Sequence, residues 1–540
     1  MATILDDFRA AVSAHPHRTA VVQAMGGGRS RSITFEELDR RSDELAAYLA
    51  SRAIASGDMV GVVMRRSIDH VVSIVAILKA GAAFYSLNPR STWAQVAYAA
   101  GLARSETVLV DFDALLNLRN IGSDGEPRFS LTLYSSERPS PFQDQRISQV
   151  RAVYPRLLTA DPGAGVPEAS STGAPVGRDV ALALFTSGST GTAKGVLISH
   201  QDLHNRVMTE CGYFGTTVED VLLNVLPFSF DVGANQLFSS LATGAQLVIL
   251  NSWMPLDIVS AIARYQVTGM SAVPAIWTSV LALDDAHAVA AGFRRLRYVT
   301  VSGGDLPPSY LTRLGGLLEG VQIFKTYGQS ETFRSGLLLP SEFKNKMRSV
   351  GRAVRGTQVY ILNAKGRQAG PGEAGEILHH GDGTMLGYLG DARATRRKLR
   401  ANPLQRGRGP CRQTVVFTGD LGCLDEDGYL YVLGRKDKMI KSSGYRVYPK
   451  EVSDQILLHP AVADAVVFGL PDRALGQAIV AEIQTKPGSA LTETEIKGFL
   501  ADRLPPYMIP SRIAFVPAFP RTPSGKIRLA EVEAKYRDTQ

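Results

Sequence analysis

Short apolar runs rich in β-branched residues alternate with segments of helical periodicity along much of the chain. The runs lie at residues 60–63, 108–110, 246–250 and 298–301, and the segment 70–78 has helical spacing. Strands that alternate with helices are typical of layered α/β folds, because the helices cover the faces of a sheet. The sequence therefore predicts an α/β fold. The chain has 540 residues, more than one core usually serves, so we expect at least two domains.

The pattern changes where charged residues and glycine gather at 434–437. Beyond this point the sequence predicts a short helix at 449–458 and strands at 463–468 and 478–484. A second helix is predicted to begin at Thr492, with Glu495 in a capping box. We therefore predict a large multi-sheet N-terminal domain at residues 1–435. Residues 436–540 are predicted to form a small α+β C-terminal domain of about one hundred residues, a common domain size.

A loop rich in glycine and hydroxyl residues lies at 185–195. It holds three glycines, five serines or threonines and Lys194 within eleven residues. Its backbone N–H groups can approach phosphate oxygens, and the hydroxyls and the lysine supply further donors. A P-loop is excluded because the spacing of glycine and lysine differs, and because apolar runs on both sides predict strand, loop, strand. The Ser-, Pro- and Gly-rich segment 134–178 before it is predicted to be a surface insertion.

Composition narrows the class of protein. Cys211, Cys411 and Cys423 lack the spacing of a metal site or a disulfide framework, as expected in a reducing compartment. We find neither a signal peptide nor a run of about 18 apolar residues, so we expect a soluble cytoplasmic protein with no membrane segment. The formal net charge is +8, but the basic residues are scattered. This argues against nucleic acid and favours an acidic protein partner.

The motif Tyr-Gly-Gln-Ser-Glu-Thr at 327–332 follows an apolar run. Tyr327 offers a flat ring for a purine. A carboxylate such as Glu331 is useful near phosphates mainly if Mg²⁺ lies between them. A helix N-cap at Ser330 is an alternative reading that is compatible with these roles.

Three further short motifs carry charge. Thr-Gly-Asp at 418–420 follows a strand-like run, and an aspartate at a strand end can accept both ribose hydroxyls. Gly-Arg-Lys-Asp at 434–437 concentrates charge at the predicted domain junction. Pro-Ser-Gly-Lys at 523–526 predicts an exposed turn with one cation. Each motif alone is typical of a solvated surface, and it is their order and spacing that indicate a site.

In this order the motifs resemble those of the adenylate-forming enzymes. This superfamily comprises the amino-acid-activating domains of peptide synthetases, the acyl- and aryl-CoA ligases and the luciferases. The resemblance runs from Leu-Lys-Ala-Gly-Ala at 78–82 through Gly-Glu-Ile at 375–377 to Lys526. One departure is Ala193, which stands where the family usually has proline and affects the stiffness of the loop more than its chemistry.

The resemblance implies ATP and Mg²⁺ as cofactors and assigns the residues that hold them. It places phosphate contacts on Thr186, Ser187, Gly188, Ser189, Thr190, Gly191 and Lys194. Tyr327 and Thr332 would contact adenine and its surroundings, Glu331 and Thr190 would ligate the metal, and Asp420 and Arg435 would bind ribose. Asp437 would be the hinge about which the small, mobile domain swings. Lys526 would be the catalytic lysine that neutralises charge on the α-phosphate, and Lys194 and Glu331 would have catalytic roles as well.

The segment Pro-Phe-Ser-Phe-Asp-Val-Gly at 227–233 bears on the choice of acid. A carboxylate in an apolar pocket is costly unless it is paired, so Asp231 should meet a cation. In the amino-acid-activating branch the matching aspartate binds the substrate ammonium, whereas fatty- and aryl-acid ligases generally lack it. The alternative is that Asp231 caps a helix running from Gly233. We expect an amino-acid substrate.

Two departures resemble free-standing enzymes that load β-amino acids in macrolactam antibiotic pathways. Gly233 and Asn235 replace the serine and bulky aromatic of many α-amino-acid domains, and Arg334 follows the Glu331 motif. This resemblance assigns the substrate side to Asp231, Asn235, Ser302, Gly303, Gly304 and Arg334. Arg334 could pair with a second substrate carboxylate, or it could form a structural ion pair. Some acyl ligases share its local sequence, so the α- and β-amino-acid alternatives stay open.

The resemblance implies a reaction in two steps. The acid would attack the α-phosphate of Mg-ATP to give an aminoacyl adenylate and pyrophosphate, and a phosphopantetheine thiol would then take the acyl group. No carrier module follows the small domain in this sequence, so we expect a separate carrier protein, commonly acidic. The alternative enzyme is an acyl- or aryl-CoA ligase. A non-catalytic nucleotide sensor is disfavoured because Glu331 and Lys526 are both present.

Overall fold

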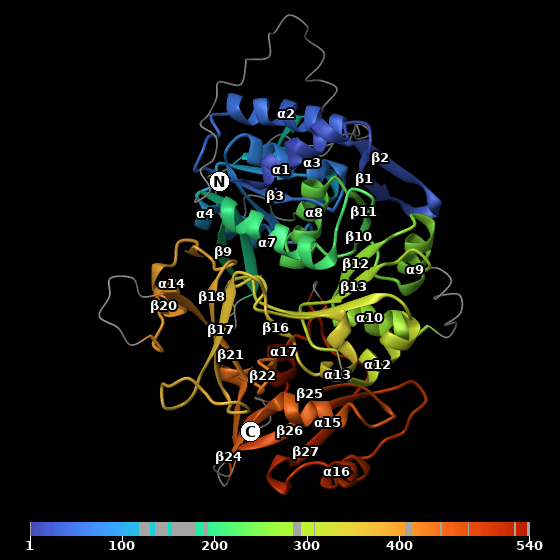
Figure 1. Cartoon of the computed structure of the whole chain (residues 1–540), viewed down its shortest axis with the longest axis vertical. Helices are drawn as coiled ribbons and strands as arrows, with labels where there is room; N and C mark the ends of the chain where they lie inside the picture. The colour runs from blue at the N-terminus through green and yellow to red at the C-terminus, as the bar shows by residue number, and fades with distance from the viewer. Residues whose placement is uncertain are drawn as a thin grey trace, which may run out of the picture.

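The computed structural model of the protein describes eleven stretches of the chain. They are residues 2–117, 130–134, 150–153, 179–187, 193–283, 293–306, 308–405, 413–442, 445–472, 475–522 and 525–536. Within them, a large domain carries three sheets and a small domain lies below it at the C-terminal end, coloured orange to red in Figure 1. No helix in these stretches combines the length and apolarity needed to cross a membrane.

The first sheet is built mainly from parallel strands. Its order across the described residues is β16 (Arg352–Ala353), β15 (Gly336–Leu338), β14 (Gln322–Tyr327), β13 (Tyr298–Val301), β12 (Gly269–Ala272), β10 (Val221–Asn224), β11 (Gln246–Leu250), β1 (Thr19–Ala24), β2 (Ser30–Thr34). The strands from β14 to β1 pair in parallel, and β15, β16 and β2 add antiparallel edges. Ligand sites in parallel sheets gather at the carboxyl ends of the strands, and Tyr327 ends β14.

The second sheet carries the arms of the glycine-rich loop. Its order in the described part is β19 (Gly387–Tyr388), β9 (Ala193–Ser199), β8 (Val180–Ser187), β4 (Ala83–Leu87), β3 (Met59–Val63), β5 (Thr107–Val110), β6 (Ser130–Tyr134), β7 (Val150–Val153). Every residue of β3 is buried, as is typical of a parallel strand covered on both faces. The predicted strands around the loop are confirmed.

Helices fill the space between these two sheets and cover their outer faces. They are α1 (Ile4–Ala14), α2 (Phe35–Ser51), α3 (Ile68–Lys79), α4 (Trp93–Ala103), α5 (Phe112–Asn117), α7 (His200–Phe214), α8 (Asp231–Thr243), α9 (Pro255–Arg264), α10 (Pro274–Leu281), α12 (Pro308–Leu317), α13 (Phe343–Lys346). The largest core joins both sheets to α1, α2, α3 and α8, with Val21, Val60 and Phe238 among its members. Residues 231–241 of α8 are all buried, because this helix lies in that core.

A third sheet links the large domain to the small one. It contains β17 (Thr357–Leu362), β18 (Gly375–Gly381), β21 (Thr414–Leu424) and β20 (Leu399–Ala401), with β22 (Leu430–Arg435) beside β21 and α14 (Ala392–Lys398) before β20. The antiparallel pairing of β21 and β22 places Asp420 opposite Arg435. The turn at Asp427 and Gly428 joins these two strands as a hairpin.

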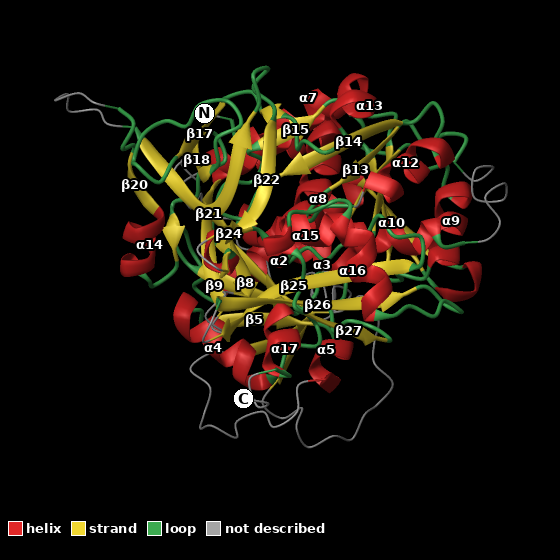
Figure 2. Cartoon of the chain, turned by 90° about the horizontal axis from the view of Figure 1, so that it is seen from below, coloured by secondary structure: helices red, strands yellow, loops and turns green. Residues whose placement is uncertain are grey.

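The small domain has its own sheet and core. The sheet contains β24 (Tyr445–Val447), β23 (Ile440–Ser442), β26 (Gly476–Thr485), β25 (Val462–Asp472) and β27 (Arg512–Val516); the helices are α15 (Pro449–Ile456), α16 (Glu493–Ala501) and α17 (Leu529–Ala534). Figure 2 looks from the side of this domain and shows β25, β26 and β27 together with α15 and α16. The capping box of Thr492 and Glu495 is formed. The predicted boundary after Arg435 falls at the end of β22 and stays a prediction.

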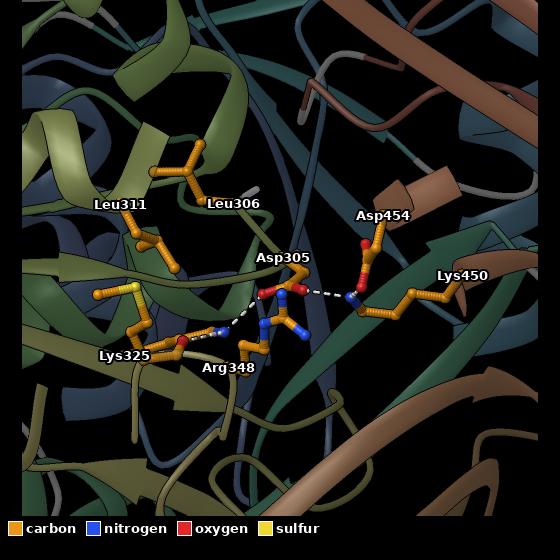
Figure 3. Close-up of a pocket in the computed structure, with 8 residues that line it drawn as sticks. Asp305, Leu306, Leu311, Lys325, Arg348, Lys450 and Asp454 are labelled. Carbon is orange, nitrogen blue, oxygen red and sulfur yellow. Dashed lines mark hydrogen bonds and ion pairs between the residues drawn. The ribbon is translucent and has the colours of Figure 1, made fainter. Parts of the chain in front are cut away.

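A cluster of charged side chains joins the two domains. Asp305, which follows the Ser302 motif, bonds Lys325 Nζ at 2.6 Å and Lys450 Nζ of the small domain at 2.5 Å. Asp454 takes a second bond from Lys450, and Arg348 lines the same pocket (Figure 3). Burial by itself would raise the pKa of Asp305, but the two lysines outweigh it and hold that pKa at about 2.

We expect this cluster to make the stability of the protein depend on pH. A carboxyl whose pKa is lowered by folding stabilises the folded state above its unfolded pKa of about 3.9, and this contribution disappears as the pH falls through about 2. The Asp305 side chain is 31% exposed, so water screens the effect. Thermal unfolding of wild type and Asp305→Asn should therefore differ most at neutral pH, and the difference should shrink as the pH falls from about 4 to about 2. A difference that is constant with pH would contradict this.

Candidate active site

The glycine-rich loop leaves one strand and enters the next. β8 and β9 pair antiparallel, with Thr186 opposite Lys194 and Ser187 opposite Ala193. The predicted phosphate contacts Gly188, Ser189, Thr190 and Gly191 lie outside the described residues. The paired strands therefore show that the loop leaves β8 at Ser187 and enters β9 at Ala193.

Tyr388 connects the loop to the predicted metal ligand. Its hydroxyl donates to Glu331 Oε1 at 2.6 Å, and Lys194 Nζ lies 5.2 Å from the centre of its ring. β19, which carries Tyr388, pairs with β9 and so sits beside the loop arm. Burial and the neighbouring Glu331 carboxylate raise the pKa of Tyr388. The sequence reasoning missed this tyrosine.

The residues predicted to bind adenosine also lie in contact with one another. Tyr327 donates from its hydroxyl to Asp420 Oδ2 at 2.6 Å, and Arg435 donates to Asp420 Oδ1 at 3.1 Å. Gln329 Nε2 donates to the same Asp420 oxygen as Tyr327, at 2.6 Å. Burial and Asp420 raise the pKa of Tyr327. Three motifs from β14, β21 and β22 thus converge on one carboxylate.

A cation that the sequence reasoning also missed lies next to this group. Lys398, at the end of α14, donates to the carbonyl oxygen of Thr418 at 2.7 Å and to Gln329 Oε1 at 3.4 Å. Burial lowers its pKa, although Glu331 and Asp420 oppose the shift. Its only sequence signal was a short basic cluster at 396–398.

The motif at 327–332 ends in a tight turn. A Cβ on Gly328 would lie 1.6 Å from the carbonyl oxygen of Phe333, so only glycine fits, and Phe333 itself has a φ of +55°. The hydroxyl of Thr332 accepts from Gln329 N and from Ser335 Oγ, both at 3.2 Å. Residues 330–332 form a turn and no helix follows before β15, so the helix N-cap at Ser330 is wrong.

The C-terminal loop brings Lys526 to the large domain. Its Nζ lies 5.7 Å from the centre of the Phe230 ring. A Cβ on Gly525 would lie 3.1 Å from the Ala275 side chain and 3.5 Å from that of Trp253, which shows how closely this loop packs. Asp437 lies at the junction of the domains, where its carboxylate accepts from Arg435 Nε at 3.3 Å.

Asp231 is the first residue of α8 and follows Phe230 directly. Its Oδ1 accepts from the backbone N–H of Val232 at 2.8 Å, and the residue is 8% exposed. The N-cap is Phe230, so the alternative in which Asp231 caps a helix running from Gly233 is wrong. The structure explains why residue 233 is a glycine, because a Cβ there would lie 2.2 Å from the carbonyl oxygen of Pro227.

The other residues assigned to the substrate side are buried and bonded within the protein. Arg334 Nε donates to Glu210 Oε1 at 2.6 Å, and Asn235 Nδ2 forms a short bond to Glu210 Oε2. Burial raises the pKa of Glu210, although Arg334 opposes the shift. Ser302 Oγ bonds the hydroxyls of Thr300 and Thr326.

The glycines of the Ser302 motif allow close packing beside Phe230. A Cβ on Gly303, which has a φ of +76°, would lie 3.0 Å from the ring of Phe230, and one on Gly304 would lie 3.2 Å from Pro274. The Ser302 motif therefore borders the same aromatic ring as Lys526.

Comparison with known proteins places this geometry in a family. The AMP-binding enzyme family matches residues 8–389, and the AMP-binding enzyme C-terminal domain matches residues 451–526. The chain belongs to the AMP-binding enzyme family. This confirms the prediction of an adenylate-forming enzyme of the AMP-forming ligase class and, with the solved structures, the predicted division into a large α/β and a small C-terminal domain.

The similar proteins include both peptide synthetases and CoA ligases. A linear gramicidin synthase of Brevibacillus parabrevis is 29% identical over 529 residues, which cover 96% of this chain and 6% of that protein. The chain spans less than a tenth of the first curated relatives it matches. ATP-bound MatB from Rhodopseudomonas palustris has a TM-score of 0.82 and 24% identity over 100% of both chains.

A second solved structure, also a distant one, has the same fold. The o-succinylbenzoate CoA synthetase MenE of Bacillus subtilis, in complex with the acyl-adenylate intermediate OSB-AMP, has a TM-score of 0.78 and 24% identity, over 98% of this chain and 97% of that one. At this distance the likeness concerns the fold, so the acid and the thiol acceptor have to be argued from the residues of this chain.

Proposed function

We propose that the protein activates an amino acid with ATP, giving an aminoacyl adenylate and pyrophosphate, and then transfers the acyl group to a phosphopantetheine thiol. The observation that carries this proposal is the position of Lys526 against Phe230, the residue that precedes Asp231. A cation suited to the reacting carboxylate and phosphate thus lies against the aromatic residue that directly precedes Asp231, a buried carboxylate suited to the substrate ammonium.

In the first step the substrate carboxylate attacks the α-phosphate and the bond to pyrophosphate breaks. Negative charge grows on the phosphate oxygens, and Lys526 and Lys194 would lower its energy. Asp420 and Arg435 would hold the ribose, and the Tyr327 ring would face adenine. Tyr327, Asp420 and Arg435 are already joined by hydrogen bonds within the protein, so they need little reorganisation at the moment of reaction.

Glu331 fits the role of a magnesium ligand. One of its oxygens accepts from Tyr388, and a carboxylate keeps further lone pairs for a metal. Mg²⁺ commonly binds one or two carboxylates together with substrate phosphates, so a single glutamate beside the loop arms suits it. When bound, the ion would neutralise phosphate charge; Glu331 would hold it, and Tyr388 would orient Glu331.

Within this function we propose a β-amino acid and a separate carrier protein, as in the biosynthesis of natural products. The β assignment is supported by the resemblance of Gly233, Asn235 and Arg334 to free-standing enzymes of that kind. The small domain would rotate about Asp437 to admit the thiol. The net charge of +8 suits an acidic carrier, which electrostatic attraction would draw to the enzyme.

The test is pyrophosphate exchange into ATP, measured across α-amino, β-amino, aryl and fatty acids. We expect an amino acid to support exchange and the corresponding acid without its amino group to support little. Thioester formation, measured with coenzyme A and with a phosphopantetheinylated acidic carrier, then identifies the acceptor. If only aryl or fatty acids support exchange, the alternative of an acyl- or aryl-CoA ligase replaces this proposal.

A further inference from the structure

An ion pair connects the first turn of α15 in the small domain to the large domain. Lys450 is the second residue of α15, and its Nζ lies 2.5 Å from Asp305 Oδ2. A cation is unfavourable near the start of a helix, because the helix dipole places partial positive charge there. Two carboxylates compensate for this position, Asp305 across the domain boundary and Asp454 one turn along α15.

Asp305 ties this contact to the strands that carry the candidate site. It follows the Ser302 motif, which comes directly after β13, and its Oδ1 lies 2.6 Å from Lys325 Nζ (Figure 3). The Lys325 side chain is 2% exposed and belongs to β14, two residues before Tyr327. The ion pair therefore fixes α15 relative to the ends of the two strands that lead into the predicted substrate and adenosine residues.

The same orientation of the small domain brings its C-terminal loop against the large domain. Lys526 Nζ lies 5.7 Å from the centre of the Phe230 ring, and a Cβ on Gly525 would lie 3.5 Å from the Trp253 side chain. Within the small domain, α15 packs into one core and the C-terminal segment into another, and β25 and β26 contribute to both. Lys450 and Lys526 therefore belong to one body and change position together.

The ion pair can open without leaving a charge alone. If the domains separate, Asp305 keeps Lys325, and Lys450 keeps Asp454 at 2.7 Å. Arg348, which is exposed at the same pocket, is a further cation on the side of the large domain. Breaking a buried pair is strongly unfavourable when one partner stays buried and uncompensated, and here each partner retains an opposite charge. The arrangement therefore suits a contact that forms and breaks.

We propose that the ion pair of Asp305 and Lys450 holds the small domain in the orientation that presents Lys526 to the reacting groups, and that it opens when this domain rotates for the thiol step. Asp305 and Lys450 are positioning residues, because they act through Lys526. The inference rests on the proposed function for the role of Lys526. The docking of the small domain can be measured without any reaction.

The variant Lys450→Met tests the pair in pyrophosphate exchange, measured with whichever acid supports it. Methionine removes the charge, Asp305 retains Lys325, and the Asp454 side chain is 35% exposed and so is left to water. We expect kcat to fall about 5-fold or more, because fewer molecules hold Lys526 in place. The KM for ATP should stay within about twofold, since the residues assigned to ATP in the large domain are unchanged. Lys450→Arg keeps the charge and should retain kcat within about twofold.

Lys497→Met is the matched control. Lys497 forms the same kind of pair one helical turn apart, with Glu493 on α16 of the small domain, at 2.7 Å. This variant removes a helical ion pair and leaves the contact between Asp305 and Lys450 intact. Its kcat and KM should match those of wild type.

Trp253 gives a readout that needs no reaction. The chain has three tryptophans, of which Trp93 is 4% and Trp277 0% exposed, whereas Trp253 is half-buried against the Gly525 loop. Acrylamide should therefore quench mainly the fluorescence of Trp253. We expect stronger quenching in Lys450→Met than in wild type, Lys450→Arg or Lys497→Met, because the loop leaves Trp253 when the small domain undocks.

The two readouts separate the ion pair from the proposed function. Equal quenching in the four folded proteins, or a kcat of Lys450→Met within about twofold of wild type, overturns the inference. If quenching rises as expected but only aryl or fatty acids support exchange, the ion pair is upheld and the proposed amino-acid substrate fails.

Discussion

Replacing Lys526 by alanine should reduce adenylation on the order of 10²- to 10³-fold. The lysine reaches the large domain from the small one and lies beside Phe230. In the proposed reaction it is a cation aimed at charge that develops on the carboxylate and the α-phosphate, and removal of one such group commonly has an effect of this size. Pyrophosphate exchange measures the loss directly.

Two measurements separate this effect from damage to the fold. Lys526 is exposed, so ATP binding measured by calorimetry and the thermal unfolding midpoint should change little. Lys497→Ala is a matched control, because Lys497 is a lysine of the small domain that pairs only with Glu493 and the Ser511 carbonyl in the described structure. Exchange by Lys526→Ala within about twofold of wild type would remove the lysine from the chemistry.

The sequence was sufficient where a motif carries both its chemistry and its local structure. The loop at 185–195 predicted its flanking strands, and the motifs of Tyr327, Asp420 and Arg435 named three side chains that meet in space. Tyr327 ends a strand of a largely parallel sheet, where ligand sites gather, so this motif could be expected at the site.

The residues that were missed act through contacts between distant segments. Tyr388 is 57 residues from Glu331, and Glu210 is 124 residues from Arg334. A lone tyrosine in a short strand or a glutamate in a helix has no motif around it, and only the folded chain gives it a partner. The prediction that Asp231 caps a helix starting at Gly233 was wrong for a similar reason. The helix α8 begins at Asp231 itself, and Gly233 is explained by its close packing against the carbonyl oxygen of Pro227, a contact that only the folded chain shows.

Replacing Asp231 by asparagine should remove the preference for an amino acid. The side chain is buried at the start of α8 and next to Phe230, and asparagine can keep its bond to Val232 N while losing the charge. A buried charged partner of an ammonium commonly contributes enough that its loss lowers kcat/KM about 10²-fold or more. We expect this loss in pyrophosphate exchange with the preferred amino acid.

The matched comparison for Asp231 is the same acid without its amino group. That analogue has no ammonium for Asp231 to bind, so its exchange should change by less than about threefold in the variant, and the ratio of the two substrates isolates the charge pair. Because Glu210 and Arg206 interact electrostatically with Asp231, loss of its charge also changes the energies of these two buried charges. An equal loss for both substrates would therefore assign Asp231 to its interactions with Glu210 and Arg206 and leave the ammonium to another residue.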